Sequence, residues 1–184
     1  MAEILLIHSS GPQGPGEGSA PFAARLDDEL GSDYEVLFPK LPDPDDPHYV
    51  PWSERVGQLL DDLDAPSVVV GHSLGASVLL KHLAEGGSQE SIAGLLLAET
   101  PFWGQSDWEA EWALPAGWPN DSTRLPPTHL FHSRDDEVIP FAQLELYTKR
   151  LSDAEVHPLD GNGHLLDRGD LTEILETIRA LTPD

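Results

Sequence analysis

The sequence places one serine where its hydroxyl could act as a nucleophile. Residues 71–75 read GHSLG, with Ser73 at the centre. A Val-rich run at residues 67–70 precedes this motif and a helical pattern at residues 74–84 follows, which predicts a strand, a sharp turn and a helix. Such a turn lifts the hydroxyl clear of the sheet, requires small residues two positions away on each side, and points free helix N–H groups at a developing oxyanion. The structural alternative is that Ser73 only caps the helix.

A serine hydroxyl is a poor nucleophile without a base, and His164 is the candidate base. It lies within residues 160–165 (DGNGHL), a glycine-rich turn between the last expected strand and the last expected helix. From a loop at the carboxyl edge of a parallel sheet, a histidine can reach the serine. The alternative is that His164 is a surface histidine in a glycine turn.

A catalytic histidine also needs a carboxylate that orients it, and Asp136 is our candidate. It lies in residues 132–140 (HSRDDEVIP), after the fifth expected strand and before the next helix. The three residues follow one another as Ser73, Asp136 and His164, which is the order expected when the serine lies in a nucleophile elbow. The adjacent Asp135 is the main rival, and Asp160 is a weaker one that we expect to form a turn.

The oxyanion needs two hydrogen-bond donors. We expect the backbone N–H of Leu74 to be one, because it follows the nucleophile, and the backbone N–H of Ser10, in the loop after the first strand, to be the other.

Short apolar runs alternate with helical patterns along the chain. This alternation predicts an α/β fold of one domain over residues 1–184, a three-layer α/β/α sandwich around a mostly parallel six-stranded sheet. We expect strands at residues 4–7, 34–38, 67–70, 92–98, 128–132 and 155–159, and helices at residues 22–30, 52–63, 74–84, 141–151 and 171–181. No clear period is visible at residues 100–127.

Aromatic residues are concentrated between residues 101 and 119, after the fourth expected strand. Phe102, Trp103, Trp108 and Trp112 are candidate walls of an acyl or leaving-group pocket at the edge of the sheet where the active site is expected. An equally weighted alternative is a short helix pinned to the core by its tryptophans, and a carbohydrate platform is a less favoured third.

Composition excludes several classes of function. The formal net charge is -23, which disfavours nucleic acids and anionic membrane surfaces as partners. The chain contains no cysteine, which removes thiolate catalysis and cysteine-type zinc sites. The histidines show no metal-ligand spacing and the glycine-rich residues 11–18 lack a nucleotide-binding fingerprint, so we expect no metal and no cofactor. Without a signal sequence or a long apolar run, the sequence predicts neither secretion nor a transmembrane helix, and the lack of cysteine fits a cytoplasmic protein. We expect a monomer or a small homo-oligomer.

The motif at residues 71–75, the segment from Asp136 to Pro140 and the pair Gly163-His164 resemble the α/β-hydrolase superfamily. Residues 41–44 (LPDP) resemble the compact branch of retinoblastoma-binding-protein-type serine hydrolases. The resemblance implies a fold without a large cap, in which the second strand is at an edge of the sheet and the first lies beside it. The His-Gly pair that this family usually carries after the first strand is replaced here by His8-Ser9.

These residues together predict a serine hydrolase of the carboxylesterase class (EC 3.1.1). It would cleave small carboxylic esters, with amides and thioesters as further candidates, through a Ser-His-Asp triad and an acyl-enzyme. The alternative from another class is a non-catalytic binding scaffold that retains the hydrolase fold. A lyase or haloperoxidase-like use of the same triad is a third, less favoured hypothesis.

Overall fold

A computed structural model of the chain describes residues 1–104, 110–120 and 124–183. Within these residues, no helix has both the length and the apolar character that are needed to cross a membrane.

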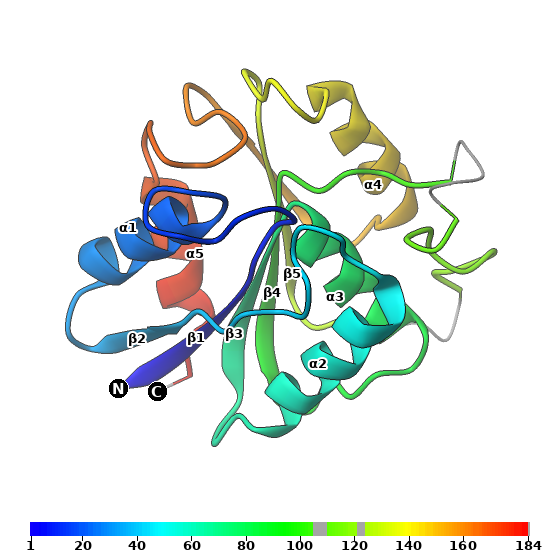
Figure 1. The fold of residues 1–184 in the computed structure, drawn as a ribbon, viewed down its shortest axis with the longest axis horizontal. Coiled ribbons are helices and arrows are strands. Elements are labelled where there is room, and N and C mark those ends of the chain that lie inside the picture. The colour runs from blue at the N-terminus through cyan, green and yellow to red at the C-terminus, as the bar shows by residue number, and fades with distance from the viewer. Residues whose placement is uncertain (105–109, 121–123, 184) are drawn as a thin grey trace.

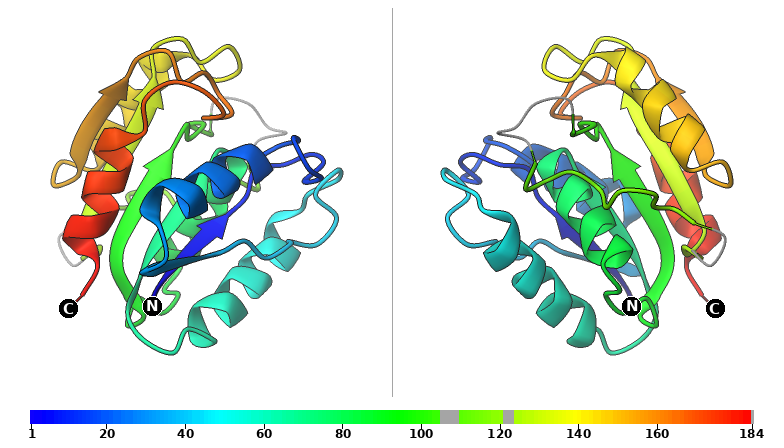
Figure 2. Two further views of the ribbon diagram at one scale, coloured as in Figure 1. Left: turned by 90° about the vertical axis from the view of Figure 1, so that its left-hand side faces the viewer. Right: turned by 90° about the vertical axis from the view of Figure 1, so that its right-hand side faces the viewer.

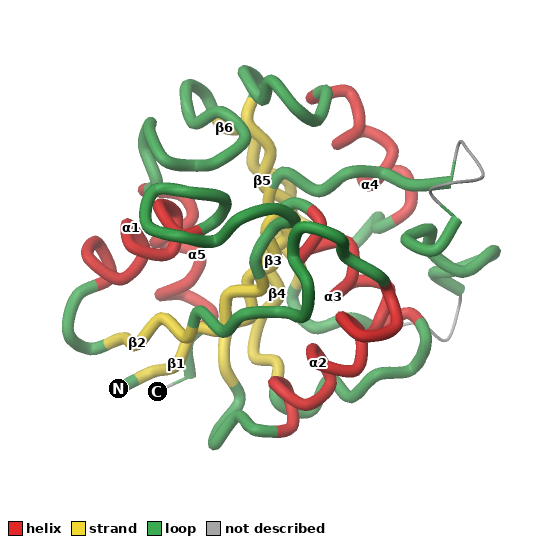
Figure 3. Tube along the Cα trace, viewed as in Figure 1, coloured by secondary structure: helices red, strands yellow, loops and turns green. Residues whose placement is uncertain are grey.

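The centre of the molecule is a sheet of six parallel strands (Figures 1 and 3). Its order is β2-β1-β3-β4-β5-β6, so β2 is at one edge with β1 beside it, as the resemblance implied. The strands are β1 (Ala2–Ile7), β2 (Tyr34–Leu37), β3 (Ser67–His72), β4 (Ile92–Ala98), β5 (Thr128–Ser133) and β6 (Glu155–Leu159). Because all strands are parallel, their carboxyl ends meet at one edge.

Helices cover both faces of the sheet, which gives three layers (Figure 2). On one face, α1 (Ala20–Leu30) and α5 (Thr172–Leu181) pack on the strands, and on the other face α2 (Tyr49–Asp61), α3 (Leu74–Ala84) and α4 (Leu144–Arg150) do so. Alternate strand residues bury their side chains in opposite layers, as β geometry requires. Strand residues facing α2 and α3 are Leu5, Ile7, Val69, Ile92, Leu95, Leu97 and Leu130. Those facing α1 and α5 are Ile4, Leu6, Val68, Val70, Leu96, Ala98, Phe131 and Leu159.

The proline-rich segment after β2 is tied to the core by two hydrogen bonds. The backbone N–H of Leu41 donates to Nε2 of His8 over 2.8 Å, and the indole N–H of Trp52 donates to the carbonyl of Pro42 over 2.6 Å. His8 is buried, and desolvation lowers its pKa, so its ring stays neutral and keeps the lone pair that accepts from Leu41. The segment is thereby held beside the end of β1.

The expected helix at residues 141–151 differs from the structure at its start. Residues Phe141–Gln143 form a 3₁₀ turn, and the α-helix α4 begins at Leu144. The N–H of Gln143 donates to the carbonyl of Pro140 over 2.8 Å, a bond between residues three apart that tightens this turn. The irregular stretch expected at residues 100–127 contains neither helix nor strand in the part that the structure describes.

Candidate active site

The chain turns sharply between β3 and α3, and Ser73 occupies this turn. Its φ angle is +53°, in a region that L-residues rarely adopt, and its N–H donates to the carbonyl of Ala98 over 2.9 Å. A Cβ atom on Gly71 would lie 2.5 Å from Cα of Ala76, and one on Gly75 would lie within 3.0 Å of the carbonyl oxygens of Ile7 and His8. The near-collision of strand and helix that was expected here is therefore present, and only glycine fits on either side.

His164 lies between Ser73 and Asp136 and contacts both. Its Nε2 is 3.1 Å from the Ser73 hydroxyl oxygen, and its Nδ1 is 2.8 Å from Oδ2 of Asp136. Because a carboxylate can only accept, Nδ1 carries the proton and donates it to Asp136. Nε2 of His164 then keeps a lone pair that can accept the Ser73 proton, which is the arrangement of a general base next to its nucleophile.

The Asp136 side chain is fully buried and is fixed at both oxygens. Its Oδ1 accepts hydrogen bonds from the backbone N–H groups of Val138 and Ile139, at 2.7 and 2.8 Å. Burial alone would raise its pKa, but hydrogen bonds from His132 and His164 outweigh burial and hold the pKa of Asp136 well below its usual range. Asp136 is therefore ionised and ready to stabilise a positively charged His164.

The two rival carboxylates lie elsewhere. Asp135 accepts hydrogen bonds from the Ser133 hydroxyl (2.5 Å) and from the N–H groups of Gly161 and Gly163 (3.0 and 3.2 Å), so it shapes the loop that carries His164. Asp160 forms an exposed ion pair with Arg134 at 3.4 Å. Of the three candidates, Asp136 is the one in hydrogen-bond contact with the His164 ring.

Sequence reasoning missed Glu99, which follows β4 directly. Its side chain has no exposed surface, and both of its oxygens accept from the N–H of Ser133, at 2.9 and 3.1 Å. Burial and a hydrogen bond to the ionised Asp136 raise the pKa of Glu99 to about 10, so it is a neutral acid that can donate to Asp136. Like Ser73, Glu99 has a positive φ, of +50°. An acidic residue directly after a buried strand was the signal that could have revealed it.

His132 lies next to the two carboxyl groups. Its Nε2 is 3.4 Å from both Asp136 Oδ2 and Glu99 Oε2, and 3.0 Å from the carbonyl of Ile139. These contacts place an N–H donor beside the Asp136 carboxylate, where it helps to keep the charge on that residue.

His72, inside the GHSLG motif, connects three segments around the site. Its Nε2 lies 2.8 Å from the carbonyl of His164, and its Nδ1 lies 2.7 Å from the Ser19 hydroxyl, which can donate to it. The Ser19 oxygen accepts from the N–H of Ser9 at 2.8 Å. Complete burial and the neighbouring His164 lower the pKa of His72 to about 3. A neutral His72 can donate from Nε2 and accept at Nδ1, so it positions the His164 backbone.

Of the two expected oxyanion donors, Leu74 directly follows Ser73, and Ser10 lies in the loop after β1. Leu74 is the first residue of α3, where backbone N–H groups have no partner within the helix. The contacts around Gly75 show that the start of α3 lies directly against the end of β1, so the Ser10 loop is nearby. The amide of Gln13 donates to the carbonyls of Ser9 and Gly11, both at 3.0 Å, and so shapes this loop.

The aromatic residues proposed as pocket walls occupy different environments. Trp112 is buried in the core with Tyr49 and Trp52, as the structural alternative expected, but the described residues around it do not form the helix of that alternative. Trp103 is partly buried and donates from its indole N–H to the hydroxyl of Ser77 over 2.8 Å. Phe102 packs edge-on against Tyr147 with the ring centroids 5.1 Å apart. Trp108 lies outside the described residues.

The four central groups follow four neighbouring strands. Ser73 comes after β3, Glu99 after β4, Asp136 after β5 and His164 after β6. Ligand atoms of Glu99, Asp136 and His164 lie within 4.8 Å of one another, a spacing that could hold a metal ion. Hydrogen bonds already account for each of these groups, so their arrangement is explained without an ion. The site brings together a hydroxyl, an imidazole, an ionised carboxylate and the N-terminal end of a helix.

A family model described as "Serine hydrolase" matches residues 22–182. No curated protein matches the sequence. Among solved structures, the ydeN gene product of B. subtilis is 17% identical, with a TM-score of 0.71 over 98% of each chain.

Two further structures share the fold. A YdeN-like hydrolase from Pectobacterium atrosepticum is 18% identical, with a TM-score of 0.70 over 99% of this chain and 94% of that chain. An esterase from Exiguobacterium antarcticum is 13% identical, with a TM-score of 0.74 over 98% of this chain and 91% of that chain. These likenesses agree with the α/β-hydrolase fold that the sequence predicts.

Proposed function

Because the chain belongs to the serine hydrolase family, we propose that it hydrolyses small carboxylic esters through a covalent acyl-enzyme on Ser73. The observation that carries this proposal is the position of the His164 ring, which is 3.1 Å from the Ser73 hydroxyl and 2.8 Å from the Asp136 carboxylate. A histidine held between a strained serine and an ionised aspartate has the geometry that acyl transfer needs.

In the first half of the reaction, Nε2 of His164 takes the Ser73 proton as the serine oxygen attacks the ester carbonyl. The tetrahedral intermediate then collapses, His164 protonates the departing alkoxide, and an alcohol leaves. Asp136 keeps the His164 proton on Nδ1 and stabilises the imidazolium. The backbone N–H groups of Leu74 and Ser10 are the proposed donors to the oxyanion.

In the second half, water replaces the alcohol. His164 removes a proton from water, which attacks the acyl carbonyl, and then returns the proton to the Ser73 oxygen. The products are a carboxylic acid and the free enzyme. The same sequence of steps applies to thioesters and amides, and we place small, neutral esters first because the net charge of -23 disfavours anionic substrates. We further propose that the enzyme acts in the cytoplasm and resembles the retinoblastoma-binding-protein-type branch.

The test is to treat the purified protein and its Ser73→Ala variant with a fluorophosphonate probe and to measure the intact mass. We expect one adduct on the parent and none on the variant. In parallel, the parent should hydrolyse p-nitrophenyl acetate and the variant should not, while both give the same circular dichroism spectrum. A matched control is Ser67→Ala, which removes a buried hydroxyl at the opposite end of β3 and should retain labelling.

An unlabelled parent, or equal labelling of parent and Ser73→Ala, would refute the proposal. An unlabelled parent that is inactive on every ester tested would favour the binding scaffold instead.

A further inference from the structure

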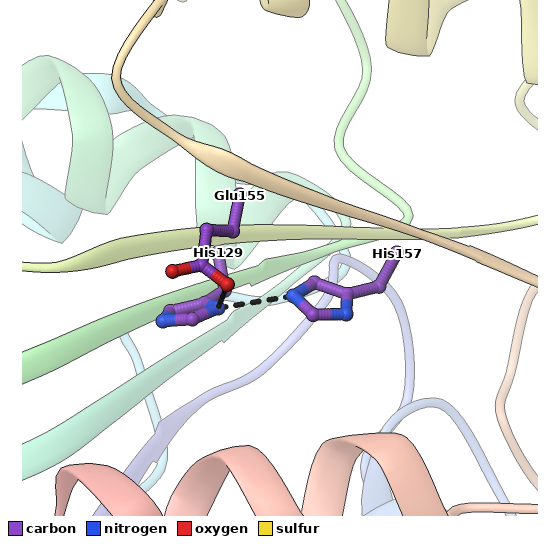
Figure 4. Close-up of side chains that lie close together, drawn as sticks. All are labelled: His129, Glu155 and His157. Atoms are coloured by element: carbon purple, nitrogen blue, oxygen red, sulfur yellow. Dashed lines mark hydrogen bonds and ion pairs between the residues drawn. The ribbon is translucent and has the colours of Figure 1, made fainter.

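A second cluster of chemically active side chains lies on β5 and β6, away from Ser73. His129 is near the amino end of β5, and Glu155 and His157 are on the neighbouring strand β6 (Figure 4). The strand register pairs His129 directly with Glu155. Since alternate residues of a strand share one face, His157 projects from the same face as Glu155. The catalytic groups follow the carboxyl ends of these strands, so the two sites are separate.

The donor atoms of the three side chains converge on one point. Nδ1 of His129 is 3.0 Å from Nε2 of His157 and 3.8 Å from Oε2 of Glu155. The three candidate ligand atoms all lie within 4.8 Å of one another. In a tetrahedral zinc site with Zn–N bonds of about 2.05 Å, two nitrogen ligands are about 3.3 Å apart. A movement of a few tenths of an ångström would therefore bring the two imidazoles to ligand positions.

The surroundings suit metal binding in two further ways. Oε2 of Glu173, on α5, lies 3.5 Å from Nδ1 of His157, so it can accept the proton of that nitrogen and leave the Nε2 lone pair facing the cluster. A carboxylate that orients a ligating histidine in this way is a recurrent feature of metal sites. The His157 ring is also stacked on Phe131, with the planes 13° apart, which restricts its orientation.

The burial of His129 favours the same conclusion. The residue is 9% exposed, so its ring is held beside His157 and is not turned into solvent. A neutral imidazole offers a lone pair to a cation. Without an ion, Nδ1 of His129 donates a hydrogen bond to Nε2 of His157 over 3.0 Å. With an ion, His129 carries its single proton on Nε2.

We propose that His129, Glu155 and His157 form a zinc-binding site that fastens β6 to β5, with Glu173 orienting His157. A set of two imidazoles and one carboxylate favours zinc as the bound metal, because calcium and magnesium prefer ligands that are all oxygen. Water would occupy the fourth position. The two histidines are 28 residues apart, so their spacing along the chain does not indicate a metal site. The proposal is independent of the esterase activity.

The test uses the full chain, freed of metal with a chelator and titrated with Zn²⁺ in excess Ca²⁺, which occupies carboxylate clusters on the acidic surface. We expect one zinc per chain by calorimetry, a rise of the thermal unfolding midpoint with zinc, and visible absorption bands of tetrahedral type when Co²⁺ is used. His157→Gln should remove all three signals. Glu173→Gln should weaken zinc affinity by roughly 10- to 100-fold, as expected for an orienting carboxylate.

The matched control is His48→Gln, which removes an exposed histidine outside the cluster and should bind zinc like the parent. If His157→Gln does not fold, Glu155→Gln replaces the exposed ligand, whose side chain is 73% accessible, and should weaken binding without unfolding the protein. Absence of a stoichiometric zinc site in the parent, or binding that neither Glu155→Gln nor His157→Gln reduces, would overturn the proposal.

Discussion

The carboxyl groups of Glu99 and Asp136 share one buried, hydrogen-bonded site, and neither side chain has any exposed surface. Two carboxyl groups this close cannot both be ionised without strong repulsion. The charge is on Asp136, which receives hydrogen bonds from the ring of His164 and from two backbone N–H groups. Glu99 keeps its proton, and it is thereby a neutral donor that supports the acid of the proposed triad.

A neutral Glu99 predicts that Glu99→Gln is tolerated and that Glu99→Ala is not. Glutamine is nearly isosteric and uncharged, so esterase kcat should change little. Alanine leaves the N–H of Ser133 without its acceptor and opens a cavity, which should cost about 2–4 kcal/mol of unfolding free energy and lower kcat. Urea denaturation and steady-state kinetics measure both quantities. A Glu99→Gln enzyme as impaired as Glu99→Ala would contradict the neutral assignment.

The pH dependence of protein stability gives a second test of the protonation of Glu99. The pKa of Glu99 rises from an ordinary 4.5 to about 10 in the folded protein. Between those values the folded state holds a proton that the unfolded chain releases, so this residue makes stability fall as pH rises. Relative to the parent, Glu99→Gln should therefore be more stable at pH 9 than at pH 5. A difference that does not vary with pH would argue against a raised pKa.

Replacement of Asp136 and Asp135 should have unequal effects. Asp136→Asn would favour the wrong His164 tautomer, and kcat should fall by roughly 10³–10⁴-fold. Asp135→Asn keeps an oxygen that can accept from Gly161 and Gly163, so its kcat should fall by less than about tenfold. Initial rates with p-nitrophenyl acetate at saturating concentration make the comparison. If Asp135→Asn were the more damaging variant, Asp135 would have to be reconsidered as the orienting acid.

Gly75, two residues after the proposed nucleophile, should not accept a side chain. Gly75→Ala places a methyl group against the backbone carbonyls of Ile7 and His8, which cannot move aside as a side chain can. We expect a loss of about 3 kcal/mol or more in unfolding free energy and a loss of activity. In Gly14→Ala the new methyl group meets only the mobile end of Glu17, so stability should change by less than about 1 kcal/mol. Similar stabilities of the two variants would contradict a close contact between Gly75 and the end of β1.

Acid should destabilise the protein through His72. Its pKa is lowered from 6.5 to about 3, so between these values the unfolded chain binds a proton that the folded protein does not. Stability should therefore fall as pH decreases from about 6.5 to 3. In His72→Gln, chemical denaturation at several pH values should show a shallower decline than in the parent. Equal slopes for both proteins would show that His72 does not contribute to acid denaturation.

The fold and the three proposed triad residues were accessible from sequence because their signals are local. Buried strands such as Val68–Val70 are continuous apolar runs, and the glycines around Ser73 report a contact between adjacent elements. Glu99 was missed because its role depends on contact with Asp136. Asp136 is 37 positions later in the chain, and the two residues lie close together only because they follow the neighbouring strands β4 and β5.

The role of Trp112 could not be settled from sequence for a similar reason. A tryptophan near the active edge of a sheet suits both a pocket wall and the core. Its burial depends on Tyr49 and Trp52, which belong to a helix far earlier in the chain. Long-range packing of this kind leaves no periodic trace in the sequence around Trp112.

His164 is attached to the outermost strand of the sheet, since β6 borders β5 and ends the strand order. Outer elements commonly open at lower free energy than the centre of a sheet. In mild denaturant, a partly open form in which β6 has detached would keep the Ser73 turn but lose its base. Enzymatic inactivation should then precede the loss of ellipticity, and amide exchange in β6 should be faster than in β3. If zinc binds between His129 and His157, inactivation and the loss of ellipticity should occur at the same denaturant concentration.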